Sequence, residues 1–259
     1  MPNTTATRFN LSSVNKQFTI AAIDLLVKDG KLKRDDTVGA LLPEYPNAQA
    51  RTATVEQLLG HRGGIADFFG TDFDAAPKRR FRSNADYFAF VAPRPLDFPP
   101  GTSERYCNGC YVVLGEIIAR VSGMPYERFV AERIFAPRGM TQSGWFDSDE
   151  IVPQVAMGYT KRLPGAEGVL HANVFSRGAA GSAAGGGYST AADLLAFFKA
   201  GATGSGGGEG DAIGIAGGSP GSAALVEMRG PWTAIVLSNL DPPSAAVGAA
   251  IVRQLSSTR

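Results

Sequence analysis

Ser13 and Lys16 are spaced for acyl transfer chemistry, just before an apolar stretch that begins at Ile20. In a helix, residues three apart lie on one face. A serine hydroxyl becomes a nucleophile when a neighbouring base takes its proton, and a lysine can be that base when burial or nearby positive charge lowers its pKa. Free backbone N–H groups at a helix N-terminus would also face a developing oxyanion. The alternative is a capping serine followed by a solvated surface lysine.

The helix that must carry this pair is predicted to begin at Ser12 or Ser13, either of which can act as the N-cap, and to end at Gly30. A short helix follows the capping box that Thr54 and Gln57 can form. Periodicity and capping residues predict further helices over 84–91, within 106–123, over 126–134, after Thr190 with Asp193 or Ser189 as capping partners, and over 244–257.

Strands are predicted mainly near the end of the chain. Residues 222–228 and 232–238 indicate a β-hairpin, and 212–217 a short strand before it. The segment 136–181 has no clear period and is interpreted as a loop, and 201–211 has the composition of a flexible linker.

Composition favours a globular protein with small partners. The 259 residues are 44% hydrophobic, and 25 basic against 24 acidic residues give a net charge of +1 without a long charged block. This balance argues against nucleic acid as a partner. No segment reaches the roughly 20 apolar residues of a membrane span, and residues 1–10 lack the apolar core of a signal peptide. We therefore expect a soluble chain, in either the cytoplasm or the periplasm.

Cysteines and histidines give weaker signals. Cys107 and Cys110 form a CxxC pair without the second pair of a structural zinc site. A redox or metal role stays open beside the interpretation as two small side chains sharing a helix face. His171 is expected on the surface of a loop, and no metal or organic cofactor is predicted.

Five segments in a fixed order carry a resemblance to a known family. They are SVNK at 13–16, LLGHRGG at 58–64, YCN at 106–108, GGGYSTAADL at 185–194 and GIAGGSPG at 214–221. Together they resemble the motifs of the serine β-lactamase and penicillin-binding-protein-like superfamily, in particular the class C-like branch that includes family VIII carboxylesterases and DD-peptidase relatives. The resemblance covers nearly the whole chain.

The resemblance implies a role for each matching residue. Ser13 would be the acylated nucleophile, Lys16 would exchange its proton, and Tyr106 would be the second general acid or base. Asn108 would hold Lys16 and the substrate by hydrogen bonds. The backbone N–H groups of Ser13 and Gly218 would form the oxyanion hole. His61 resembles the structural histidine behind the site, packed and hydrogen-bonded rather than a proton carrier.

The resemblance also implies a fold. The expected fold is α/β (α+β), of the β-lactamase/transpeptidase type, with an antiparallel sheet flanked by helices. Residues 1–30 and 181–259 would together form this α/β body, and residues 31–180 would form a mostly helical region. Relatives have further residues before the nucleophile helix, so the sheet is expected to lack N-terminal strands. A reduced sheet would leave an unpaired edge, which predicts lower stability or self-association.

The pattern departs from the family at the third motif. Family members present Lys, His or Trp followed by a small residue, whereas this chain has Ile215 and Ala216 there. Isoleucine cannot bind the carboxylate of a β-lactam or a peptidoglycan stem peptide. We therefore predict a serine hydrolase acting through a Ser13 acyl-enzyme, foremost a carboxylesterase for short-chain esters. A β-lactamase or DD-peptidase, and a catalytically impaired binding member of the fold, are the alternatives.

Overall fold

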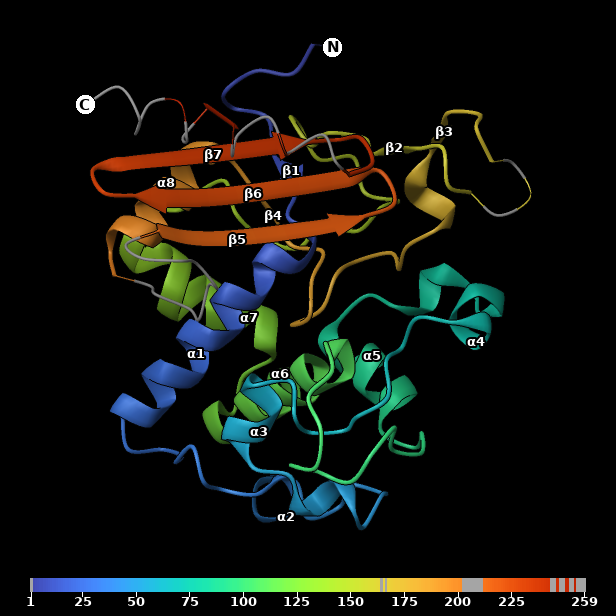
Figure 1. Cartoon of the computed structure of the whole chain (residues 1–259), viewed down its shortest axis with the longest axis vertical. Coiled ribbons are helices and arrows are strands. Elements are labelled where there is room, and N and C mark those ends of the chain that lie inside the picture. The colour runs from blue at the N-terminus through green and yellow to red at the C-terminus, as the bar shows by residue number, and fades with distance from the viewer. Residues whose placement is uncertain are drawn as a thin grey trace. The chain divides into compact units, whose positions relative to one another are not determined.

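Two compact units make up the chain in the computed structural model (Figure 1), which describes residues 2–163, 165, 167–201, 212–242, 246, 250, 251 and 254. Unit 1 comprises Met1–Gln17, Phe135–Ala180 and Gly185–Arg259, and unit 2 comprises Phe18–Ile134 and Gly181–Ala184. The division expected from sequence differs because it groups 18–30 with the sheet and 135–180 with the helical region.

Unit 1 contains a three-stranded antiparallel sheet. Its strands are β5 (Ala212–Ser219), β6 (Ser222–Arg229) and β7 (Trp232–Ser238), in the order β5-β6-β7 (Figure 1). The register pairs Gly218 with Ala223, and Pro220 with Gly221 forms the turn between β5 and β6. Gly221 has φ +72°, a conformation that glycine adopts without steric cost. The predicted hairpin is confirmed, and the strand before it is two residues longer than expected.

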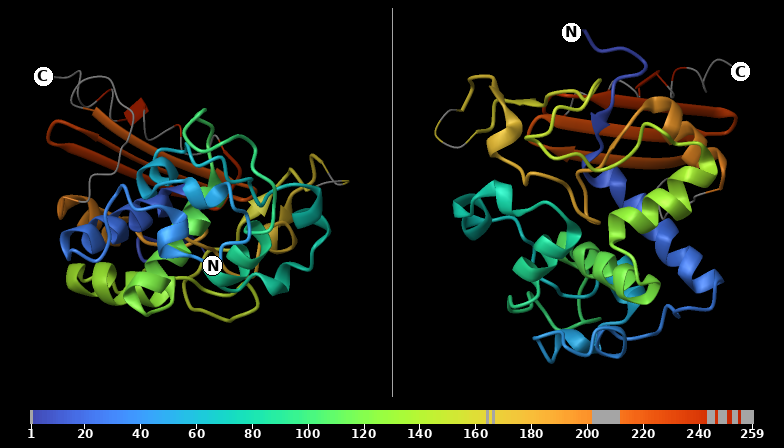
Figure 2. Two further views of the ribbon diagram at one scale, coloured as in Figure 1. Left: turned by 90° about the horizontal axis from the view of Figure 1, so that it is seen from below. Right: turned by 180° about the vertical axis from the view of Figure 1, so that it is seen from behind.

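Two short ladders and a helix also belong to unit 1. The ladders join β1 (Phe9–Asn10) to β4 (Tyr188–Ser189), and β2 (Tyr159–Thr160) to β3 (His171–Ala172). Helix α8 (Ala191–Lys199) contacts β7 and lies behind the sheet in the view of Figure 1 and in front of it in the right panel of Figure 2. The interpretation of 136–181 as a loop was therefore incomplete, because β2, β3 and two 3-10 helices, Ala136–Arg138 and Asn173–Phe175, lie within it.

Unit 2 is helical. It holds most of two helices, α1 (Lys16–Lys28) and the π-helix Ala131–Phe135. It also holds α2 (Val38–Leu41), α3 (Val55–Leu59), α4 (Thr71–Ala75), α5 (Asn84–Val91), α6 (Asn108–Ser122), α7 (Tyr126–Val130), and 3-10 helices at Ala50–Thr52 and Lys78–Arg80. Helix α6 is central, because α2, α3, α5 and α7 all contact it. Its residues Cys110, Val112, Leu114, Ile117 and Ile118 are fully buried.

Local sequence signals explain where these helices begin and end. Thr54 and Gln57 form the predicted capping box at α3. Helix α6 ends at Gly123, whose φ of +72° gives the left-handed C-cap. Helix α5 has the predicted bounds, and Thr190 caps α8 by accepting the backbone N–H of Asp193.

Two predictions fall on positions that the structure does not describe. These are the linker over 201–211, apart from residue 201, and most of the closing helix over 244–257. Within the described ranges, no helix combines the length and apolar character needed to cross a bilayer.

Candidate active site

The predicted nucleophile and its lysine meet within unit 1. Ser13 lies in the 3-10 helix η1 (Ser12–Asn15), which leads directly into α1 at Lys16. Lys16 Nζ donates to Ser13 Oγ over 3.3 Å. Lys16 is only 4% exposed, so the alternative of a solvated surface lysine is wrong. The predicted capping role of the serines is also wrong, since the N-cap is Leu11 and no side chain caps this helix.

Ser12 holds this turn in an unusual backbone conformation. Its φ of +47° lies in the left-handed region, which is costly for a residue with a side chain. Its N–H donates to Asn10 Oδ1 over 2.9 Å, and its hydroxyl bonds to Ser219 Oγ and Ser222 Oγ, each at 2.9 Å. These bonds to the β5–β6 turn offset the strain and fix the residue that precedes Ser13.

Strand β5 lies directly against the nucleophile turn. A Cβ added to Gly217 would be 2.8 Å from the backbone nitrogen of Ser13 and 2.6 Å from the carbonyl oxygen of Leu11. Only a residue without a side chain permits this approach. The residue before β4 also fixes the turn, because the N–H of Gly187 donates to Asn15 Oδ1 over 3.2 Å.

Gly218, the predicted second oxyanion donor, occupies a suitable place on this strand. Ser219 pairs with Ser222 to close the two-residue hairpin, and Gly218 pairs with Ala223. Bonded and non-bonded pairs alternate along an antiparallel ladder, and a two-residue hairpin closes on a bonded pair. The Gly218 N–H therefore points away from β6, toward the side of β5 on which no further strand is paired within the described residues.

The third motif presents no charge. Ile215 is 6% exposed and shares the face of β5 that includes Gly217, whereas Ala216 lies on the exposed face. An aliphatic side chain thus occupies the place where the resemblance implied a cationic or aromatic residue.

Tyr106 and His61 lie side by side in unit 2. Tyr106 precedes α6, is 53% exposed, and its ring centroid is 4.9 Å from that of His61. His61 Nδ1 accepts the N–H of Cys107 over 3.2 Å, and its ring also contacts that of Tyr111. The interpretation of His61 as a packed, hydrogen-bonded residue is confirmed.

Asn108 begins α6 and is oriented by a residue that the sequence analysis missed. Its Nδ2 donates to Asp67 Oδ2 over 2.7 Å, and Asn108 is 8% exposed. A charged acceptor fixes which way the amide faces, leaving its Oδ1 on the opposite side. Asp67 lies three residues after the LLGHRGG segment, and this closeness to a motif was the sequence feature that could have indicated a role for it.

The two cysteines are joined. Cys107 and Cys110 form a disulfide across the first turn of α6, with Cα atoms 5.3 Å apart, and Asn108 lies between them. The shared helix face was predicted, but the bond was not. Cys107 Sγ also accepts the N–H of Cys110.

His171 is not the surface loop residue that was expected. It lies on β3 and is half-buried. Its Nε2 is buried and has no hydrogen-bond partner within the part of the chain that the structure describes.

Among the predicted site residues, Ser13, Lys16 and Gly218 thus belong to unit 1, and Tyr106 and Asn108 to unit 2. A serine bonded to a lysine beside a glycine-rich edge strand, with Tyr-Cys-Asn at a helix start, defines the β-lactamase/transpeptidase class of fold. A family model described as Beta-lactamase matches residues 1–233. The chain therefore belongs to the β-lactamase family, and the predicted fold class and family are confirmed.

Individual relatives agree with this assignment. The putative penicillin-binding protein PbpX of Bacillus subtilis is 34% identical over 157 residues, which is 61% of this chain and 38% of that protein. A putative D-alanyl-D-alanine carboxypeptidase of Escherichia coli is 30% identical over 148 residues, 54% of this chain and 34% of that protein. The structure of a penicillin-binding protein from Bacillus halodurans has a TM-score of 0.85 at 26% identity, covering 98% of this chain and 88% of that one. The chain thus matches little more than a third of the length of these two curated relatives.

Proposed function

We propose that the chain is a serine hydrolase that forms an acyl-enzyme on Ser13, with short-chain carboxylic esters as its substrates. The observation that carries the proposal is the 3.3 Å hydrogen bond from the buried Lys16 to Ser13 Oγ. Burial disfavours the charged form of an amine, so this position suits a proton acceptor.

The proposed reaction has two steps. Ser13 Oγ attacks the ester carbonyl as its proton passes to Lys16, and the oxyanion is stabilised by the N–H groups of Ser13 and Gly218. The proton then passes to the departing alkoxide, leaving an acyl group on Ser13 that water hydrolyses. From unit 2, Tyr106 is proposed as the second acid–base group, with Asn108 as a substrate-positioning amide.

Ester specificity is supported by Ile215. A buried aliphatic side chain at this place on β5 offers no hydrogen bond or charge to a substrate carboxylate. Simple esters have no carboxylate, so the absence of a cationic residue at position 215 does not weaken their binding.

A second candidate is a peptidase or amidase for substrates with D-amino acids. The names of the relatives favour it, since one is a putative D-alanyl-D-alanine carboxypeptidase. The same acyl-enzyme chemistry applies, with an amine in place of the alkoxide as leaving group.

One experiment separates these functions. Purified protein is incubated with p-nitrophenyl butyrate, a chromogenic cephalosporin and a D-alanyl-D-alanine peptide, and turnover is measured beside intact-protein mass spectrometry. We expect turnover of the butyrate ester and an acyl adduct on Ser13. Faster turnover of the peptide would favour the second candidate.

The controls are Ser13→Ala and Ser103→Ala, since Ser103 is an exposed loop serine. The first substitution should abolish turnover and the adduct, and the second should leave both unchanged. If wild type and Ser13→Ala turn over the ester equally, the protein is not a hydrolase acting through this serine.

A further inference from the structure

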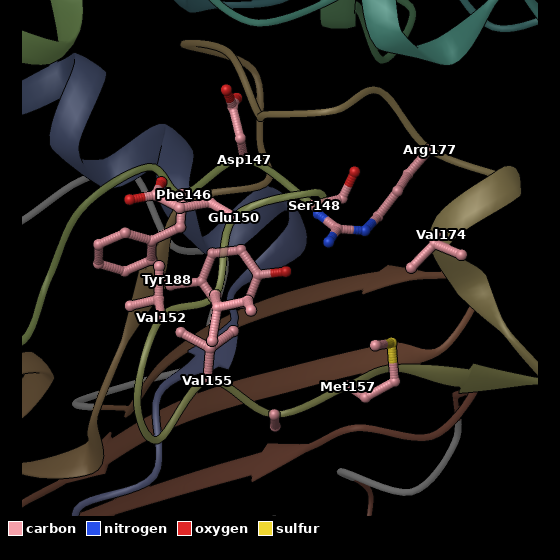
Figure 3. A pocket seen from close by; sticks show the side chains of 12 residues that line it. Phe146, Asp147, Ser148, Glu150, Val152, Val155, Met157, Val174, Arg177 and Tyr188 are labelled. Carbon is pink, nitrogen blue, oxygen red and sulfur yellow. The ribbon is translucent and has the colours of Figure 1, made fainter.

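Unit 1 contains a cavity of about 150 Å³ whose wall includes both charged and apolar side chains (Figure 3). Neither Ser13 nor Lys16 lines it. Its walls come from the segment after Gly144, from the 3-10 helix Asn173–Phe175 and its successor residues, and from β4. A cavity of this size accommodates a single six-membered ring or a short carbon chain.

Tyr188 lines this cavity and brings a hydroxyl group to it. The residue is 3% exposed, and its ring forms part of the cavity wall. Figure 3 shows this hydroxyl on the side of the ring that faces Arg177. A phenolic hydroxyl at this place can donate a hydrogen bond to a ligand carboxylate.

Arg177 provides a positive charge at the same place. Its guanidinium carbon lies 5.6 Å from the centroid of the Tyr188 ring, and its buried Nε has no hydrogen-bond partner in the described ranges. A guanidinium can donate two parallel hydrogen bonds to a carboxylate. Ser148, also in the lining, carries a second hydroxyl group.

The rest of the lining is largely apolar. Val155, Met157 and Val174 line the cavity, and Met157 is 45% exposed. Ile151, another lining residue, is 99% exposed. These side chains suit the hydrocarbon part of a ligand whose polar end meets Tyr188 and Arg177.

Two carboxylates also line the cavity, and their positions bear on the sign of the ligand's charge. Figure 3 shows the carboxylates of Asp147 and Glu150 pointing away from the guanidinium of Arg177. Glu150 is exposed, so solvent screens its charge. Arg177, by contrast, has a buried Nε donor without a hydrogen-bond partner in the described ranges, and this favours an anionic ligand.

We propose that this cavity is a binding site for a small carboxylate with one ring or a short apolar tail, separate from the Ser13 centre. Arg177 and Tyr188 bind its carboxylate, and Val155, Met157 and Val174 contact its hydrocarbon part. The proposal does not depend on the reaction at Ser13.

The test is isothermal titration calorimetry with three probes of equal size: benzoate, benzamide and benzylamine. We expect saturable binding of benzoate, weaker binding of benzamide and none of benzylamine. Ser13→Ala should bind benzoate as wild type does, which separates this site from the acylation centre. Benzylamine binding as tightly as benzoate would mean that Asp147 and Glu150 dominate, and would overturn the proposal.

Variants locate the binding. Arg177→Ala and Tyr188→Phe should each weaken benzoate binding about 10- to 100-fold, the range for a lost hydrogen bond to a charged group. Tyr188→Phe removes only the hydroxyl and keeps the ring packing, so it reports on binding even if Arg177→Ala folds poorly. Arg229→Ala, at the exposed end of β6, makes the same charge change as a matched control. Unchanged affinity in both cavity variants would refute the assignment.

Discussion

The backbone of Gly217 lies so close to the backbone of Ser13 that a side chain on residue 217 would not fit between them. A Cβ on Gly217 would lie 2.8 Å from the Ser13 nitrogen, inside the distance that real Cβ atoms keep. The strand backbone and the nucleophile turn are therefore in direct contact, and the N–H of Ser13 lies beside the strand that carries Gly218. Two N–H donors held by rigid backbone need no reorganisation when an oxyanion forms.

Gly217→Ala should push β5 away from the nucleophile turn. We expect esterase turnover to fall at least tenfold and the free energy of unfolding to fall by about 1–3 kcal/mol, the usual cost of overpacking. Steady-state kinetics and thermal melts measure the two effects. Gly144→Ala is the matched control, because its Cβ would meet only Phe146, at an ordinary 3.4 Å. Similar losses in both variants would argue against a special role of the Gly217 contact.

Lys16→Ala removes the partner of Ser13. We expect kcat for p-nitrophenyl butyrate to fall by about 10²- to 10⁴-fold, the range for loss of a general base. Lys28, at the exposed end of the same helix, offers a control of the same residue type. Lys28→Ala should retain activity, and near-normal kcat in Lys16→Ala would exclude proton transfer through this amine.

Reduction of the Cys107–Cys110 disulfide should loosen the first turn of α6. A cross-link over so short a loop contributes about 2 kcal/mol, which corresponds to roughly 4–8 °C in Tm for a chain of this size. Because Asn108 lies between the cysteines, turnover should fall as well. Thermal melts with and without a phosphine reductant test this, and the double variant Cys107→Ser, Cys110→Ser should not respond. A wild-type melt that reductant leaves unchanged would contradict the prediction.

Glu127 should make stability depend on pH. Burial raises the pKa of its carboxyl above the ordinary value of 4.5, although its Oε1 accepts the N–H of Asn84. The native state then holds this proton more tightly than the unfolded chain does. The protonated Glu127 carboxyl therefore adds its full contribution to the free energy of unfolding below about pH 4.5. This contribution is lost as the pH rises through the pKa that Glu127 has in the native state.

Glu127→Gln removes this titration. The Tm of wild type minus that of the variant should be more positive at pH 4.5 than at pH 7, as differential scanning calorimetry can measure. Glu104→Gln, at an exposed loop position, should show the same difference at both pH values. A Tm difference for Glu127→Gln that does not change with pH would count against the raised pKa.

Sequence patterns predicted the elements whose signals are local. Helix α6 has strong apolar periodicity and Gly123 at its end, and α3 has a complete capping box, so neighbouring residues determine both. The hairpin β6–β7 is similar, because its strands are separated only by Gly230 and Pro231. The pairing of Ser13 with Lys16 followed from helical spacing and from the resemblance to a family.

The remaining features depend on residues far apart in the chain. The left-handed φ of Ser12 is stabilised by Ser219 and Ser222, which no local pattern connects to it. Asp67 was missed because its role becomes visible only when it lies beside Asn108, 41 residues later. Strands β2 and β3 have two residues each, too few to produce a periodicity.

The bonds of Ser12 to Ser219 and Ser222 span 207 and 210 residues of sequence. At ribosomal rates of about 5–20 residues per second, roughly 10–40 s separate the synthesis of the first partner from that of the others. During that interval the turn lacks the bonds that offset its strain, and Gly217 is not yet there to contact Ser13. A nascent chain thus carries its serine and lysine without the surroundings that we propose make them reactive, so acylation should begin only after the C-terminal hairpin has joined.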